Sequence, residues 1–394
     1  MSTTQVVILS GSRTPQGRVN GQFSALSAVQ LGTIAIRDAI EKSGVDVNDI
    51  DQVLMGQVLQ AGAGQNPAKQ SAVAAGIPWR VPAMTLNKVC LSGLAAVIDA
   101  ARLIRLGEAS VVVAGGQESM TNAPHLLPGS RRGWAYGDVT MVDHAAFDGL
   151  TDAFDRVSMG ASTEEHNGPL AISRVDQDAV AAASHQRAGA AIEAGVFADE
   201  IVAVSVPQRK GDPVLVTTDE GVRPTSTVET LAGLRPAFSS SGTITAGNSS
   251  PLSDGASALV VASRDYAESH GLSWLAVIEA SGHVAGPDNS LHSQPSNAIA
   301  AALTRQGWEA SDLDLVEINE AFAAVAVQST RDLGIDAEVV NVHGGAIALG
   351  HPIGASGARL ALHAAHELAR RGSGRAAVAL CGGGGQGDAL LLSR

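Results

Sequence analysis

One order of elements occurs twice in this chain, and the repeat limits the possible folds more than any other feature. The stretch "CLSGLAAVIDAARLIRLGEASVVVAGGQ", residues 90–117, holds a Ser-Gly pair, a helical pattern, a polar turn, a buried strand and a Gly-Gly pair. The stretch "IGASGARLALHAAHELARRGSGRAAVALCGGGGQ", residues 353–386, repeats that order at nearly the same spacing. Two copies of one module predict two similar halves whose matching loops face one site. The alternative is the general self-similarity of α/β proteins, without duplication.

Apolar strands and amphipathic helices also alternate outside the repeat. "QVVILSGSRTP" and "IDQVLMGQVLQ" have the pattern of strands, and "SAVQLGTIAIRDAIEKSGV" that of a helix. "NPAKQSAVAAG" predicts a short helix with Pro67 near its first turn. This alternation predicts an α/β fold with a largely parallel sheet covered on both faces.

The alternation stops between Met120 and Ser250, where turns, prolines and charged residues prevail and only Asp176 to Gly195 has a helical pattern. It resumes with "DGASALVVASRDYAESHGL". We therefore expect an inserted loop domain over residues 120–250. The N-terminal half would comprise residues 1–119 plus 251–271, and the C-terminal half residues 272–394.

Composition excludes several classes of protein. The formal charge of −13 argues against a general nucleic-acid binder, which needs a basic face. The two cysteines form no CxxC pair, so we expect no metal site and a reducing, cytoplasmic location. The first residues lack the apolar core of a signal peptide, and no apolar run reaches membrane-spanning length.

Two stretches place a reactive side chain before a helix. Cys90 precedes "SGLAAV", and with Ser92 as the helix cap the helix N-terminus would favour a nucleophilic thiolate. By itself Cys90 is better explained as a small buried hydrophobe. His351 lies in "HGGAIALGHPIGASGAR", where five glycines and Pro352 predict a rigid turn that presents a base or hydrogen-bond donor.

Two further stretches end strands. In "VALCGGGGQGD" a buried strand leads Cys381 into four glycines, whose amides suit an oxyanion hole; a phosphate-binding loop is the alternative. In "EINEAFA" Asn319 either holds a water or caps a helix. Two cysteines, a histidine and an asparagine together indicate carbon–carbon bond chemistry, with one sulfur taking an acyl group and another group removing an α-proton.

The chain resembles the thiolases, which are acyl-CoA:acetyl-CoA C-acyltransferases of the acetyl-CoA acetyltransferase type, over essentially its whole length. Six ordered motifs carry the resemblance: "VPAMTLNKVCLSGLAA", "GGQESMTNAPH", "TAGNSSPLSDGA", "NEAF", "HGGAIALGHPIGASGAR" and "CGGGGQG". The resemblance implies a five-layer αβαβα fold of two similar halves with an inserted loop domain. It also implies reversible thiolytic cleavage of 3-ketoacyl-CoA or Claisen condensation, in fatty acid or lipid metabolism, by a homodimer or homotetramer.

The resemblance also implies roles for individual residues. Cys90 matches the acylated nucleophile, His351 the group that activates it and lines the first oxyanion hole, and Cys381 the acid/base for the α-proton of acetyl-CoA. Asn319 matches the residue that holds the water of the first hole, and the amides of Cys90 and Gly383 match the second. Matches to CoA or acyl contacts are Arg223, Ser250, Met159, Phe322 and Leu291. Coenzyme A is a substrate, with acetyl-CoA and acyl-CoA or 3-ketoacyl-CoA, and no cofactor or metal is expected.

Two departures bear on the acyl substrate. Ser158 stands where the family commonly has a histidine, and "LHSQP" (Leu291 to Pro295) replaces the usual Met-Gly-x-Gly-Pro loop. We expect Leu291 and His292 to line or cap the acyl pocket. The changes leave open a 3-ketoacyl chain longer than acetoacetyl.

Other interpretations stay open at this point. A decarboxylating condensing enzyme of the ketoacyl-synthase kind would pair one Cys with two His, or with His and Asn, and would not need Cys381. A catalytically silent acyl-CoA binder is a third possibility. His363 and His366 fit a solvated helix face better than a metal site, and "PGSRRGWAY" (Arg131, Arg132, Trp134) fits a solvated loop better than a phosphate or subunit contact.

Overall fold

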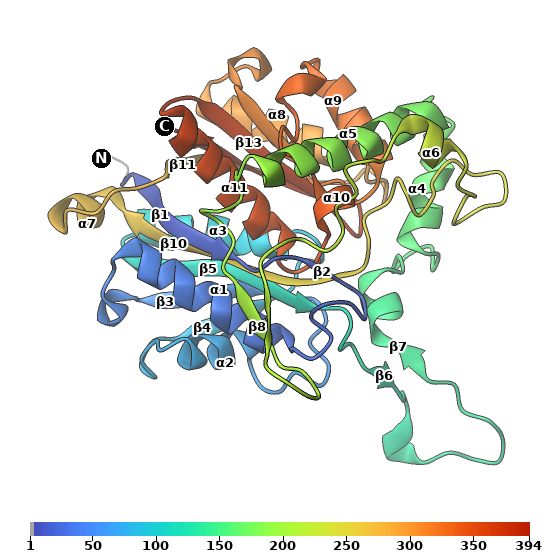
Figure 1. Cartoon of the computed structure of the whole chain (residues 1–394), viewed down its shortest axis with the longest axis horizontal. Helices are drawn as coiled ribbons and strands as arrows, with labels where there is room; N and C mark the ends of the chain where they lie inside the picture. Colours follow the sequence, from blue (N-terminus) through green and yellow to red (C-terminus); the bar gives the residue numbers. More distant parts are fainter. Residues whose placement is uncertain (1–3) are drawn as a thin grey trace.

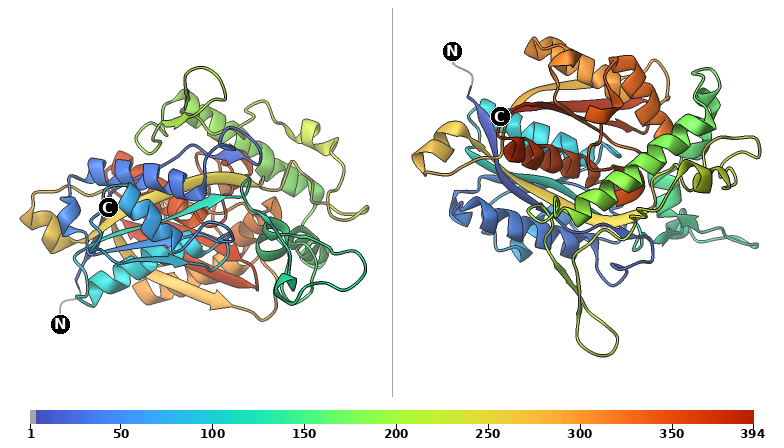
Figure 2. Two further views of the ribbon diagram at one scale, coloured as in Figure 1. Left: turned by 90° about the horizontal axis from the view of Figure 1, so that it is seen from below. Right: turned by 45° about the horizontal axis from the view of Figure 1, so that its top comes forward.

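The computed structural model describes residues 4–394, and its main body is a stack of five layers (Figures 1 and 2). Two helices, α3 (Ser92–Arg105) and α11 (Ser356–Arg371), lie in the middle and are covered on both sides by strands. The outer helices on the N-terminal side are α1 (Ala28–Ser43) and α2 (Pro67–Ala74), and those on the other side are α8 (Gln294–Gln306) and α9 (Ala323–Leu333). This is the αβαβα layering expected from the resemblance.

Ten strands form one hydrogen-bonded sheet that bends around the central helices. Its order is β12-β13-β14-β11-β1-β10-β5-β3-β4, with β2 added to β10. The N-terminal half supplies β1 (Val6–Arg13), β2 (Gly17–Arg18), β3 (Gln52–Gly56), β4 (Ala83–Leu86), β5 (Val111–Ser119) and β10 (Ser253–Ser263). The C-terminal half supplies β11 (Ala276–Ala285), β12 (Leu315–Ile318), β13 (Arg375–Gly382) and β14 (Gln386–Ser393). Pairing of β1 with β11 joins the two sets.

The expectation of a largely parallel sheet is wrong. Only β3 with β4, β3 with β5, and β12 with β13 pair in parallel within the described sheet; the other pairs are antiparallel. In the N-terminal half, β10 returns from the long insertion and lies between β1 and β5 in the opposite direction. In the C-terminal half, a short glycine turn joins β13 to β14, and so short a connection allows only antiparallel neighbours.

The two sequence repeats become the two central helices. Both helices begin at a Ser-Gly pair, and the glycines lie where the helices touch. A Cβ on Gly357 would come within 2.4 Å of the Leu94 nitrogen, and one on Gly93 within 2.9 Å of the Ala358 nitrogen. Each glycine therefore allows backbone contact between the helices, and apolar side chains of both helices form the main core with strands of the two halves.

Residues between β5 and β10 leave the layered body and cover one end of it (Figure 1). The long helix of this segment, α5 (Arg174–Glu193), confirms the predicted helix and packs on α9 and α10 (Ala346–Leu349). The segment also contains β6 (His125–Leu126), β7 (Val142–Asp143), the π-helical turn η3 (Ala145–Gly149), α4 (Met159–Asn167), β8 (Val204–Val206), β9 (Val214–Val216) and α6 (Val228–Ala232). The loop between β6 and β7 projects away from the body (Figure 1).

The remaining short elements are α7 (Arg264–Ser269) and the 3-10 turns η1 (Val47–Asp49), η2 (Ser130–Arg132), η4 (Ala310–Asp312) and η5 (Ala337–Val339). Among residues 4–394, no helix combines the length and apolar character needed to cross a membrane.

Candidate active site

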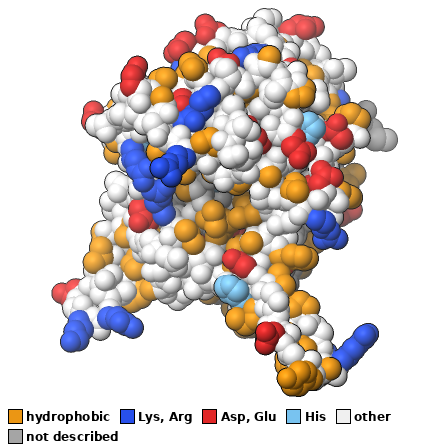
Figure 3. All heavy atoms as spheres, turned by 90° about the vertical axis from the view of Figure 1, so that its right-hand side faces the viewer, with side chains coloured by type: hydrophobic (Ala, Val, Ile, Leu, Met, Phe, Trp, Pro, Cys, Tyr) orange, Lys and Arg blue, Asp and Glu red, His pale blue; other side chains and the backbone are white. Residues whose placement is uncertain are grey.

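Both cysteines and His351 line one cavity of about 310 Å³. Cys90 comes from the turn before α3, His351 from the loop before α11, and Cys381 from the end of β13. The segment between β5 and β10 closes the cavity with Met159, Phe238 and other residues. Figure 3 shows a hollow with hydrophobic side chains on the face at the right of Figure 1, with Lys and Arg side chains beside it. Loops of both halves thus meet at one site, as the repeat predicts.

Cys90 is held in a tight turn rather than at a capped helix end. The preceding Val89 has a φ of 51°, which is strained for a β-branched residue. The Ser92 hydroxyl donates to the Val89 carbonyl (2.6 Å) and accepts from the Lys88 amide (2.8 Å). The sequence predicts Ser92 as the helix cap, and this prediction is wrong. Helix α3 begins at Ser92 itself, and Leu91 precedes it without a side-chain cap. The serine instead fixes the turn that presents Cys90.

The surroundings of Cys90 in the unliganded site favour the thiol over the thiolate expected from a helix N-terminus. Burial raises the pKa of Cys90 to about 12, although the amides of Cys90 and Gly383 oppose this rise and the carboxyl group of Glu118 adds to it. The two amides act on the sulfur from the positions predicted for an oxyanion hole. Glu118 is itself buried, and it accepts hydrogen bonds from three backbone amides that include that of Gly354.

His351 is a neutral base with its free nitrogen fixed by a serine. The Ser356 hydroxyl donates to the Pro352 carbonyl (3.0 Å), which can only accept, so Nδ1 of His351 donates to Ser356 Oγ (2.6 Å). The lone pair is then on Nε2, and Nδ2 of Asn319 lies 3.4 Å from it. Burial first, and then the charge of Arg359, lowers the pKa of His351 to about 3. The imidazole can therefore accept a thiol proton through Nε2.

Cys381 is buried at the end of β13, where the chain enters its glycine turn. Burial and the neighbouring Cys90 raise the pKa of Cys381 above its usual range. Packing requires the glycine at position 382, because a Cβ there would lie 2.7 Å from the Leu91 side chain. The turn carrying Cys90 thus presses directly on the hairpin carrying Cys381.

Asn319 follows β12 and is fully buried beside His351. It does not cap a helix, since α9 begins at Ala323 with Phe322 before it. Its Oδ1 has no hydrogen-bond partner among residues 4–394. A buried amide oxygen without a partner next to Nε2 of His351 fits the site of a bound water.

The residues predicted to contact CoA and the acyl chain divide into two groups. Ser250, Met159, Phe322 and Leu291 all line the cavity, whereas Arg223 is exposed and does not. Ser158 also lines it, and its side chain caps α4 by accepting from Ala161.

The expectation that His292 lines the acyl pocket is wrong. Its side chain is buried away from the cavity, with Nε2 bonded to Oδ1 of Asn167 (2.9 Å). The hydroxyl of Ser329 donates to its carbonyl (2.7 Å). His292 therefore holds the loop that carries Leu291 rather than forming the pocket wall.

Sequence reasoning missed several functional positions. Phe238, Leu252 and Ile353 line the cavity, but each is an isolated apolar residue in a loop and gives no pattern. Ser356 could have been found, because it repeats the Ser-Gly start of the first copy at Ser92.

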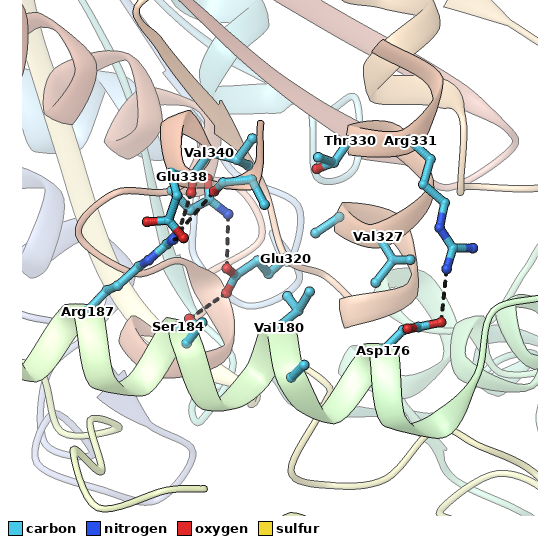
Figure 4. A pocket seen from close by; sticks show the side chains of 15 residues that line it. Asp176, Val180, Ser184, Arg187, Glu320, Val327, Thr330, Arg331, Glu338 and Val340 are labelled. Atoms are coloured by element: carbon cyan, nitrogen blue, oxygen red, sulfur yellow. Dashed lines mark hydrogen bonds and ion pairs between the residues drawn. The ribbon is translucent and has the colours of Figure 1, made fainter. Parts of the chain in front are cut away.

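A second cavity of about 360 Å³ lies between α5 and α9 (Figure 4). Its charged groups are already paired: Arg187 with Glu338, Arg331 with Asp176, and Glu320 with Ser184 and Asn341. Valine side chains cover much of the remaining wall. The cavity offers no free charged group to a ligand.

The sequence places His363 on a solvated helix face, and this prediction is wrong. His363 is buried, and its Nδ1 bonds Glu200 (2.8 Å). In the part of the chain described, no group of His, Cys, Asp and Glu is arranged to hold a metal ion. Arg131, Arg132 and Trp134 are exposed in the single chain, which agrees both with a solvated loop and with a surface that another subunit covers.

Fold and site together define a layered α/β protein with two cysteines and a histidine in one cavity, and comparisons with known proteins show its family. The family profiles "Thiolase, N-terminal domain" and "Thiolase, C-terminal domain" match residues 6–265 and 272–394. A "Probable acetyl-CoA acetyltransferase" of Mycolicibacterium smegmatis is 60% identical over 98% of this chain and 100% of its own length. An "Acetyl-CoA acetyltransferase" of Cupriavidus necator is 48% identical over 99% of this chain and 100% of its own. The crystal structure of the Bacillus anthracis acetyl-CoA acetyltransferase superposes with a TM-score of 0.96 at 38% identity, covering 99% of both chains.

The chain belongs to the thiolase family. It is an acyltransferase with the five-layer fold of that family.

Proposed function

We propose that this protein is an acyl-CoA:acetyl-CoA C-acyltransferase that cleaves 3-ketoacyl-CoA with coenzyme A, or forms it by condensation, through an acyl group on Cys90. The observation that carries the proposal is the single cavity lined by Cys90, His351 and Cys381. The decarboxylating alternative is not favoured, because that reaction has no use for the second sulfur.

The first half-reaction transfers an acyl group to Cys90. As Sγ attacks the carbonyl carbon of an acyl-CoA, its proton passes to Nε2 of His351, the ring nitrogen that carries the lone pair. The amides of Cys90 and Gly383 stabilise the oxygen that becomes negative. The carbon–sulfur bond to CoA then breaks, and the leaving thiolate takes the proton of Cys381.

The second half-reaction forms the carbon–carbon bond. The thiolate left on Cys381 takes an α-proton from acetyl-CoA. Because the pKa of the Cys381 thiol is raised, this thiolate is a strong base. The protonated Nε2 of His351 and a water on Asn319 stabilise the enolate. The enolate attacks the acyl carbon, and the Cys90 sulfur leaves with the proton held by His351. Thiolysis is the same sequence reversed.

The acyl chain would occupy the apolar part of the cavity. Met159, Phe322 and Leu291 cluster with Cys381 there, and Ser158 adds one hydroxyl to the wall. Ser250 lies at the same cavity, where a pantetheine arm must pass. We propose coenzyme A and its acyl thioesters as the small-molecule partners, with no cofactor, because thioester and thiol supply all the chemistry.

We further propose a homotetramer in the cytoplasm that serves fatty acid or lipid metabolism. The projecting loop between β6 and β7 exposes the apolar side chains of Leu127, Trp134, Tyr136, Val139 and Met141, which suits contact with another subunit. Two working thiols require a reducing compartment.

The test is turnover. Acetoacetyl-CoA plus CoA should give two acetyl-CoA, followed by chromatography, and both Cys90→Ala and Cys381→Ala should lower kcat by at least about a thousandfold. Malonyl-CoA should not replace acetyl-CoA in condensation. Turnover with malonyl-CoA that persists in Cys381→Ala would favour the decarboxylating alternative instead.

A further inference from the structure

An ion pair joins the turn that carries Cys90 to the hairpin that carries Cys381. Nζ of Lys88 lies 2.7 Å from both carboxylate oxygens of Asp388. Lys88 is two residues before Cys90, and Asp388 lies in β14 directly opposite Leu380, the residue before Cys381. Asp388 is fully buried, whereas Lys88 is about one-third exposed (31%). Neither side chain lines the cavity.

A second side chain fixes the carboxylate. Arg102 can only donate, so its contact with Nε2 of His283 (2.5 Å) makes that nitrogen an acceptor. The other nitrogen, Nδ1, therefore carries the proton and donates to Asp388 (2.7 Å). His283 and Asp388 both belong to the C-terminal half, and the hydrogen bond from His283 fixes the Asp388 carboxylate. The fixed carboxylate can then position Lys88, which belongs to the N-terminal half.

The turn needs such a restraint because its backbone is strained. A valine at positive φ is unfavourable and persists only where its surroundings enforce it. Two local hydrogen bonds hold the turn's shape: the Ser92 hydroxyl donates to the Val89 carbonyl (2.6 Å), and the Val89 amide donates to Asn87 Oδ1 (2.9 Å). They do not fix its distance from the hairpin. In the part of the chain described, two polar contacts of residues 87–92 reach the hairpin: the Gly383 amide acts on the Cys90 sulfur, and Lys88 pairs with Asp388, which is the ion pair of the two.

This distance matters for chemistry. The Gly383 amide acts on the Cys90 sulfur, and a Cβ on Gly383 would lie 3.6 Å from the Val89 side chain, so turn and hairpin are in contact at the site. A displacement of about 1 Å between reacting groups can cost about a hundredfold in rate.

We propose that Lys88 and Asp388 form a positioning clamp that sets the distance between Cys90 and the Gly383–Cys381 hairpin. Both are positioning residues. The proposal rests on the proposed thiolase function and adds to it a pair of residues that act on kcat without touching substrate.

The experiment measures thiolysis kinetics and unfolding midpoints of Lys88→Met, the double variant Lys88→Met/Asp388→Asn, and Lys88→Arg. Lys88→Met should lower kcat at least about 30-fold with KM within about twofold. The double variant leaves no unpaired buried charge, so its unfolding midpoint should approach that of the wild type. Its kcat should stay at least about tenfold below the wild-type value. Lys88→Arg keeps the ion pair and should restore most of kcat.

The matched control is Lys42→Met. Lys42 is similarly exposed (34%) and also forms a 2.8 Å ion pair, with Asp38 on α1, away from the cavity. Its replacement should leave kcat within about twofold. If the double variant keeps wild-type kcat, the ion pair is structural only and the clamp is refuted.

A readout independent of turnover separates the two proposals. Iodoacetamide alkylation of Cys90 should be slower in Lys88→Met than in wild type, because the Gly383 amide no longer favours the thiolate. If wild type lacks thiolysis, the proposed function fails, and alkylation alone decides the clamp: an equal rate in both proteins refutes it.

Discussion

At the scale of single residues, the site at rest holds no charge pair between Cys90 and His351. Burial raises the pKa of Cys90 to about 12 and lowers that of His351 to about 3, so both groups are neutral at physiological pH. Proton transfer from sulfur to Nε2 then belongs to the attack on substrate, which protects the nucleophile from side reactions while the cavity is empty.

This neutrality predicts how Cys90 reacts with iodoacetamide in the absence of substrate. Because only the thiolate reacts, the rate should rise about tenfold for each pH unit between pH 6 and 9, without a plateau. The measurement is the alkylation rate of the Cys90 peptide by mass spectrometry, which separates it from the buried Cys381 peptide. A rate already constant above about pH 6 would reveal a thiolate–imidazolium pair and contradict the account.

Most of the site residues could be predicted from the sequence, because each of them lies in a local motif. Cys90, His351 and Cys381 were placed correctly beside glycines or helix starts, and they meet as predicted. The protonation of Cys90 was not accessible, since burial depends on the whole cavity and outweighs the local helix end. The contact of Lys88 with Asp388 joins residues 300 positions apart and leaves no local signal.

At the scale of elements, contact between α3 and α11 ties the cysteine turn to the histidine loop. Gly93 and Gly357 lie at this contact, and both follow a serine that holds a site loop, Ser92 under Cys90 and Ser356 under His351. The position of the helices therefore sets the position of the two reacting groups.

Gly357→Ala tests this coupling. Alanine favours a helix by up to about 1 kcal/mol, but here its Cβ would overlap the Leu94 backbone, so we expect a net loss of about 2 kcal/mol in the free energy of unfolding and a lower kcat. Urea unfolding and thiolysis assays measure both. The control is Gly168→Ala, where no atom lies within 4 Å of the new Cβ. Unchanged stability in Gly357→Ala would show that the helices do not touch as described.

Helices and strands themselves were predicted well, whereas strand direction was not. Helical periodicity is local, so α1, α2 and α5 were located within a few residues of their bounds. Direction depends on which strands become neighbours, and β10 reaches its place only after the long insertion.

At the scale of the whole molecule, loops of the two halves line the cavity, and the segment between β5 and β10 covers it. One of its joints to the C-terminal half is the buried bond between Asn167 of α4 and His292 beside α8. Burial, and then the charge of His166, lowers the pKa of His292 to about 4. In the unfolded chain a histidine titrates near 6.5.

This joint predicts a loss of stability in acid. Between pH 6.5 and about 4 the unfolded chain binds a proton at His292 that the folded protein does not, so stability falls as pH falls through this window. From pH 7.5 to 5 the stability advantage of wild type over His292→Gln should shrink by about 2 kcal/mol in urea unfolding. His125→Gln, at an exposed site, controls for the substitution itself. A constant advantage would mean that the pKa of His292 is the same in the folded protein as in the unfolded chain.

The two similar halves could be predicted because the repeat is visible in the sequence. The joining of their strands into one bent sheet could not. The pairing of β1 with β11 joins residues about 270 positions apart, and no pattern in either strand specifies it.

The central claim is that two sulfurs in one cavity have separate tasks, and intact-protein mass spectrometry after mixing with acetyl-CoA tests it most directly. We expect an acetyl adduct in wild type and in Cys381→Ala, and none in Cys90→Ala. An adduct that survives in Cys90→Ala, or one that Cys381→Ala abolishes, would contradict the division of labour proposed for the two cysteines.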